Sequence, residues 1–134
     1  MSLAPYLLMT KGPELVLEAF RFQVEGTSDP DALVPYQQGV TNVTRSSIGL
    51  FAITLATKYP TLISCVGSVQ AAAASGGDTV GLHVYPVSYT ASTGVLVVRV
   101  ENHAGAADDP TDEDWVHVQA VFCRRSGMAP SGAI

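Results

Sequence analysis

The sequence predicts an all-β domain: an antiparallel β-sandwich, jelly-roll-like, of seven to eight strands with an extended N-terminal arm. The stretch 39–70 reads GVTNVTRSSIGLFAITLATKYPTLISCVGSVQ and contains three short apolar runs that alternate with polar residues. These runs are separated by Ser46-Ser47, Gly49 and Tyr59-Pro60. Such period-2 alternation between turn residues is typical of neighbouring β-strands. Turn-forming residues recur roughly every ten residues along the chain, as in sandwiches and jelly rolls.

The first half of the chain is expected to hold four strands. In the first, Phe20, Phe22 and Val24 are expected to fall on one face, with Arg21 and Gln23 on the other. Residues 25–38 are rich in Asp, Pro and Gly and are expected to form a long loop. In the fourth strand, Ile63 is expected to share an apolar face with Cys65 and Val69, opposite a face of Ser64, Val66 and Ser68. The expected bounds are Leu17–Val24, Val40–Arg45, Gly49–Leu55 and Leu62–Ala71.

The second half is expected to hold three more strands. Pro86 cannot donate a hydrogen bond, which predicts an edge or a bulge near the end of the fifth strand. The sixth strand is apolar on both faces, which predicts burial between two layers or at a subunit contact. The expected bounds are Thr79–Val87, Gly94–Asn102 and Trp115–Arg124.

These elements predict one domain with two extensions: an N-terminal arm (1–17), the sandwich (18–125) and a C-terminal tail (126–134). The arm contains several apolar side chains, yet Pro5 and Gly12-Pro13 disfavour a regular element. Because a free apolar arm is unfavourable in water, we expect it to pack across a neighbouring subunit.

Composition restricts the function classes. Of the 134 residues 47% are hydrophobic and only 14% are charged, and the net charge is −5. Either the chain is simply rich in small uncharged residues, or it is an oligomer or virion component whose surface is partly covered by neighbours. The negative charge argues against a nucleic-acid partner. No apolar run is long enough to cross a membrane, so no membrane partner is expected.

The residues of greatest chemical interest do not form a known catalytic pattern. His83, His103 and His117 lack the close spacing of zinc ligands, and the serines lack a Gly-x-Ser-x-Gly elbow. Cys65 and Cys123 each lie in an expected strand and are predicted to be reduced. The protein is therefore not expected to be an enzyme or to need a cofactor.

The acidic stretch before Trp115 is the only candidate metal site. Five carboxylates lie within seven residues, and hard oxygen ligands at this density can bind calcium. The EF-hand pattern is not met, so a solvated loop that protects a β-edge from aggregation is the competing interpretation. The calcium candidates are Asp108, Asp109, Asp112 and Asp114.

One family resemblance runs from about Val40 to Arg125. It is carried by Gly39-Val40-Thr41 with Val43-Thr44-Arg45, by Gly49–Leu55 leading to Tyr59-Pro60, and by Asp114-Trp115-Val116-His117-Val118 followed by Val121-Phe122. This pattern resembles the small β-sandwich virion structural proteins of tailed bacteriophages, of the capsid decoration or head-fibre type. The resemblance implies a capsid decoration (cement) subunit that forms a homotrimer and binds the major capsid protein or a neighbouring virion protein. It also implies localisation in the virion after synthesis in the host cytoplasm.

A second interpretation is a receptor- or carbohydrate-binding jelly roll at the tip of a head or tail fibre. Exposed aromatic side chains would then line a sugar site. The candidates are Trp115, Tyr85, Tyr89 and Tyr36, although a lone Trp near a loop is more commonly a core residue.

Overall fold

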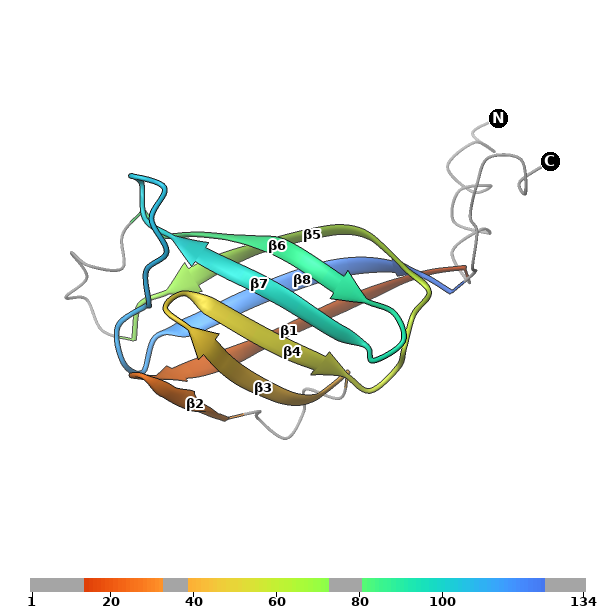
Figure 1. Cartoon of the computed structure of the whole chain (residues 1–134), viewed down its shortest axis with the longest axis horizontal. Helices are drawn as coiled ribbons and strands as arrows, with labels where there is room; N and C mark the ends of the chain where they lie inside the picture. Colours follow the sequence, from red (N-terminus) through yellow and green to blue (C-terminus); the bar gives the residue numbers. More distant parts are fainter. Residues whose placement is uncertain (1–13, 33–38, 73–80, 125–134) are drawn as a thin grey trace, which may run out of the picture.

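The computed structural model describes residues 14–32, 39–72 and 81–124 (Figure 1). Within these ranges every regular element is a β-strand, and all paired strands are antiparallel. The all-β prediction is therefore confirmed. The eight strands are β1 (Leu15–Glu25), β2 (Ser28–Ala32), β3 (Val40–Ser47), β4 (Leu50–Leu55), β5 (Thr61–Gln70), β6 (His83–Thr90), β7 (Val95–Glu101) and β8 (Trp115–Cys123).

The eight strands form one nearly closed, barrel-like sheet in the order β2-β1-β8-β5-β6-β7-β4-β3. Strands β5, β6 and β7 are consecutive neighbours, and β8 returns to lie beside β5, which is a Greek-key arrangement. The two end strands, β2 and β3, contact each other and nearly complete the ring. This connectivity places the long β7–β8 loop across one end of the molecule.

The sheet consists of two four-stranded halves that meet at a narrow junction. Strands β5 and β6 are paired only at Gly67 and Val84. In Figure 1, β7 and β4 cross in front of β8 and β1, so the two halves enclose the core between them. Across that core the rings of Phe22 and Phe51 lie 5.1 Å apart, centroid to centroid.

Alternation along the strands directs one side chain in two into this core, as the sequence predicts. Phe20, Phe22 and Val24 are buried on β1, whereas Arg21 and Gln23 are not. The largest fully buried side chains are Phe22, Phe51, Phe122, Ile53, Leu96, Val24, Val98, Val100, Val116, Val118 and Cys123. Burying each large aliphatic or aromatic side chain contributes about 1.5–3 kcal/mol, so these positions supply much of the folding free energy.

The expected loop 25–38 is wrong in part, because it contains strand β2. Gly26 has a φ of 56°, which suits the tight turn between β1 and β2. Pro30 lies within β2, and the strand tolerates it because β2 is an end strand of the sheet. Residues 33–38 lie outside the described ranges.

The remaining strands are present with shifted ends. Strand β6 is displaced most, since it begins at His83 rather than Thr79; residues 79–80 are outside the described ranges. Of the two possibilities expected at Pro86, an edge or a bulge, the structure shows a bulge, because the register shifts between Pro86 and Ser88.

The expected apolar face of β5 is wrong at Ile63. A register shift between Leu62 and Ser64 makes Ile63 an extra residue in the ladder, and 47% of its surface is exposed. Such a bulge changes which side chains face inward. Cys65 and Val69 still pack against the core, now with Leu62 in place of Ile63.

The expected arm and tail fall largely outside the described residues, at 1–13 and 125–134. Strand β1 already begins at Leu15, so residues 15–17 of the expected arm belong to the sheet. No helix in the described ranges is long and apolar enough to cross a membrane.

Candidate functional site

The outward side chains of β1, β8 and β5 form a regular surface, which we call the four-rung face. Their inward neighbours, such as Phe22 and Val118, are buried, so these positions point away from the core. The backbone register aligns them in four rungs across the three strands. The rungs are Leu17–Val121–Ser64, Ala19–Gln119–Val66, Arg21–His117–Ser68 and Gln23–Trp115–Gln70.

The four-rung face contains no carboxylate, although the chain has 12 Asp and Glu residues and a net charge of −5. Its one formal charge at neutral pH is that of Arg21. The first two rungs expose large apolar side chains, since Leu17 and Val66 are each 62% exposed. Leu15, which is 39% exposed, extends this apolar end by one position along β1. Exposed apolar area of this kind marks contact surfaces.

The other two rungs are polar and partly covered. The guanidinium of Arg21 lies 4.2 Å from the centre of the Trp115 ring, a cation–π contact. His117 Nε2 donates to Gln70 Oε1 across 2.7 Å. Burial, followed by the nearby Arg21, lowers the pKa of His117 below its ordinary value.

A shallow, open depression of about 260 Å³ lies on the same face. It is lined by Val66, Gly67, Ser68, His117 and Gln119. An added Cβ at Gly67 would lie 2.7 Å from the His117 carbonyl oxygen, so β5 and β8 approach closely there. Hydroxyl, imidazole and amide groups around a small apolar patch can bind a polar ligand that has some apolar surface.

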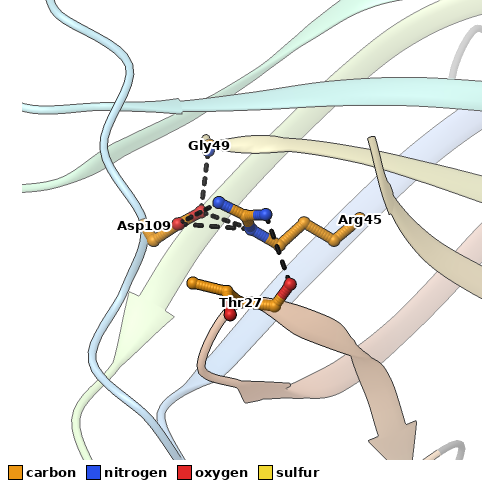
Figure 2. A network of polar contacts seen from close by, with 4 residues as sticks. All are labelled: Thr27, Arg45, Gly49 and Asp109. Carbon is orange, nitrogen blue, oxygen red and sulfur yellow. Dashed lines mark hydrogen bonds and ion pairs between the residues drawn. The ribbon is translucent and has the colours of Figure 1, made fainter. Parts of the chain in front are cut away.

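At one end of the molecule, Arg45 of β3 links three segments (Figure 2). Its Nη2 lies 2.6 Å from Asp109 Oδ2, and its Nε lies 3.2 Å from both carboxylate oxygens of Asp109. Its Nη1 donates to the Thr27 carbonyl oxygen at 3.3 Å, and its backbone N–H donates to Asp29 Oδ1 at 2.8 Å. Arg45 thus joins β3 to β2 where the ring is least complete. Asp109 raises the pKa of Arg45 above its ordinary value.

Asp109 also orders the β3–β4 turn. Its Oδ1 accepts a hydrogen bond from the Gly49 N–H at 2.8 Å (Figure 2). Gly49 has a φ of 69°, and an added Cβ would lie 2.5 Å from the Val100 carbonyl oxygen. Only glycine fits this turn without strain. The four residues Arg45, Asp109, Gly49 and Thr27, drawn in Figure 2, are called the Arg45 cluster below.

The four calcium candidates do not converge on one point. Asp109 belongs to the Arg45 cluster, whereas Asp114 is buried and accepts from the N–H groups of Ala72 and Thr111 at 2.9 and 3.1 Å. Asp108 is half-buried and Asp112 is exposed. Within the described residues, no group of three or more His, Cys, Asp or Glu side chains is placed to hold a metal ion. The carboxylates of Asp109 and Asp114 thus satisfy backbone and guanidinium donors.

The aromatic residues expected to line a sugar site do not share one surface. Trp115 lies on the four-rung face and Tyr85 is exposed on β6. Tyr89 points inward, where its ring lies 5.1 Å from that of Phe122 and its hydroxyl donates to the Tyr59 carbonyl oxygen at 2.6 Å. Tyr36 lies outside the described residues.

The three histidines lie on three different elements. His83 is exposed on β6, His103 is exposed in the β7–β8 loop, and His117 belongs to the four-rung face. Cys65 and Cys123 form no disulfide. Burial raises the pKa of the Cys65 thiol, which makes it a weaker nucleophile.

Two contacts of charged residues have no recognisable signature in the sequence. Arg45 was assigned only to a strand, and its Asp109 partner lies 64 residues away, so no local pattern reveals the pair. Glu18 accepts from the Tyr59 hydroxyl at 2.8 Å across 41 residues, where the Tyr59 ring stacks on Phe122. The one local signal was alternation: Glu18 and Arg45 occupy positions on their strands that face inward.

Comparison with known proteins adds no relative: no protein-family model, curated protein or solved structure matches this chain.

Proposed function

We propose that this protein is a virion structural protein, a capsid decoration subunit that stabilises a tailed-phage head as a homotrimer bound to the major capsid protein or a neighbouring virion protein. The finer fold belongs to the same proposal: a jelly-roll-like sandwich whose two sheets are the halves that meet at Gly67 and Val84. The proposal rests on the family resemblance and on one structural observation, the distribution of exposed apolar residues.

That observation is that large apolar side chains are exposed on both halves of the sheet in one small domain. Leu15, Leu17 and Val66 lie at the apolar end of the four-rung face. Ile48, at the β3–β4 turn, and Val87, on β6, are 58% and 53% exposed on the other half of the sheet. A subunit that contacts both its own copies and a shell needs at least two such regions. Each contact of a few hundred Å² contributes useful free energy at about 25 cal/mol per Å², because it repeats over the whole shell.

The test is the composition and stability of particles from the phage that encodes this chain. Mass spectrometry is expected to find the chain in purified particles in a fixed ratio to the major capsid protein. Particles assembled without it should lose DNA at a lower temperature, because a ligand that binds the assembled shell stabilises it. A gene that does not belong to a phage, or particles that lack the chain, would refute the proposal.

The second candidate is a receptor- or carbohydrate-binding fibre tip. It is favoured by the depression beside His117 and Gln119, with Trp115 on the neighbouring rung. A glycan array discriminates the two candidates. Binding that is lost in Trp115→Ala and His117→Ala would favour the fibre tip, whereas an array without signal would favour the decoration subunit.

A further inference from the structure

We infer that the four-rung face is the surface through which copies of this chain associate, turned toward the axis of a cyclic trimer. In that arrangement each copy contacts its two neighbours through different sides of this face, as in any cyclic trimer. The inference deepens the proposed homotrimer by assigning its interface. It rests on that proposed assembly but does not depend on the assembly being part of a virion.

The charge distribution is the first argument that other copies of this chain cover the four-rung face. Two copies with a net charge of −5 repel each other, and this repulsion is weakest where neither presents a carboxylate. The four-rung face meets that condition over all four rungs. Glu25, the next outward residue of β1, lies beyond the last rung and pairs with Ser28 in the β1–β2 hairpin. The single cation, Arg21, is already held against Trp115 within its own chain.

Shape is the second argument. The face comes from three paired strands, and its small side chains, such as Ala19 and Ser68, let neighbouring copies approach it closely. Leu17 and Val66 project from it and are mostly exposed in the single chain. Contact with the two neighbouring copies around the axis would bury them.

Area determines how strong this contact can be. A stable interface usually involves about 20–30 residues on each side, so the twelve residues of the four rungs amount to roughly half of one. Association through the face alone is therefore expected to depend on concentration.

The experiment measures solution mass by size-exclusion chromatography with light scattering, over a dilution series of the full chain. Wild type is expected to approach three times 14.0 kDa as concentration rises. Gln119→Glu changes only a charge in the second rung, at an exposed position. It should raise the dissociation constant at least about tenfold, and added salt should restore part of the loss. Leu17→Glu should weaken association further.

Matched controls place the same changes elsewhere. Asn42→Asp introduces a carboxylate at an exposed position of β3, and Ile48→Glu replaces an apolar residue that is 58% exposed. Both should retain the wild-type mass. Thermal unfolding of each variant verifies folding, and Gln119→Glu still tests the inference if Leu17→Glu does not fold.

Three outcomes would overturn the assignment. The first is a wild-type chain that stays monomeric up to about 0.5 mM, near the limit of weak association. The second is a trimer that Gln119→Glu and Leu17→Glu leave intact. In that case the copies associate through another surface, and the four-rung face has a different role. The third is equal dissociation of the control variants. The two proposals can also be told apart. If the variants dissociate the trimer as expected but the chain is absent from phage particles, the interface is supported and the proposed function is refuted.

Discussion

Arg45 on β3 and Asp109 in the loop before β8 form an ion pair that joins segments 64 residues apart, with Nη2 2.6 Å from Oδ2. Their side chains are only 13% and 20% exposed, so both charges are largely removed from water. Losing one partner leaves the other charge without compensation, which costs more than the pair contributes while intact. This relationship leads to the first prediction.

Asp109→Ala is expected to lower the free energy of unfolding by about 2–3 kcal/mol, less than a fully buried pair because some solvent reaches this one. Urea denaturation measures the change. Asp112→Ala, at an exposed loop position, should stay within about 0.5 kcal/mol of wild type. In a double-mutant cycle with Arg45→Ala, a coupling energy near zero would show that the pair is not important for stability.

Gly49→Ala is expected to be more damaging than other glycine changes. The residue has a φ of 69°, and the new Cβ would lie 2.5 Å from the Val100 carbonyl oxygen and 2.9 Å from the Asp108 nitrogen. Conformation alone costs about 1 kcal/mol, and the backbone clash should add at least as much again.

Gly26→Ala is the matched control for Gly49→Ala. Gly26 also has positive φ, 56°, but its added Cβ would meet nothing within 4 Å. Thermal or urea unfolding of both variants separates the clash from the conformational cost. Equal destabilisation would mean that the turn relaxes away from Val100.

His117 predicts a pH dependence of stability. Its folded-state pKa is lowered, so the unfolded chain takes up a proton first as the pH falls. The contribution of His117 is therefore fully present above its ordinary pKa of about 6.5 and is lost as the pH falls below that value. Arg21 on β1 is the cation that faces it, and Ser68 and Gln70 are its neighbours on β5.

His117→Gln should therefore lose less stability than wild type between pH 7.5 and pH 5. Urea unfolding at both pH values, in dilute protein of constant mass, measures the difference. An identical loss in the two proteins would show that carboxylates elsewhere account for the whole dependence.

Tyr59 predicts a second pH dependence of stability, at alkaline pH. Burial, followed by its hydrogen bond to Glu18, raises its pKa above the ordinary value of 10.0. A raised folded-state pKa stabilises the fold below pH 10, and that contribution is lost as the pH rises through the folded-state pKa. Tyr59→Phe should remove this dependence and should cost about 1 kcal/mol at neutral pH through the lost hydrogen bond. Melting curves from pH 8 to pH 11 test both; a wild-type slope in the variant would assign the effect to other tyrosines.

Calcium is expected to have no effect on stability. Asp109 and Asp114 already accept hydrogen bonds from several donors in the described structure, so binding would have to break existing contacts. A calcium-binding fold would melt at a higher temperature with millimolar calcium, whereas this chain should melt at the same temperature with calcium or EDTA. Uptake in equilibrium dialysis would contradict this prediction.

Several elements of this fold could be predicted because they depend on local alternation. Phe20, Phe22 and Val24 on β1 and Leu96, Val98 and Val100 on β7 are buried as their spacing indicates. The bulge at Pro86 follows from a missing donor. Strand β2 was missed because an end strand with Asp and Pro looks like a loop, and Ile63 was misplaced because a bulge changes the alternation without a glycine or proline to mark it.

By itself, the sequence determined that the chain is all-β, which strands are amphipathic and that charge is scarce, because each depends on composition or on neighbours along the chain. Strand order was decided only in the tertiary structure, and strand order determines which residues meet. It brings Arg45 to Asp109, and it aligns outward residues from β1, β8 and β5, which are far apart in sequence, into one face without a carboxylate. The physical reason is that residues paired in an antiparallel register point to the same face of the sheet. Which strands pair with each other, however, depends on how the whole core packs.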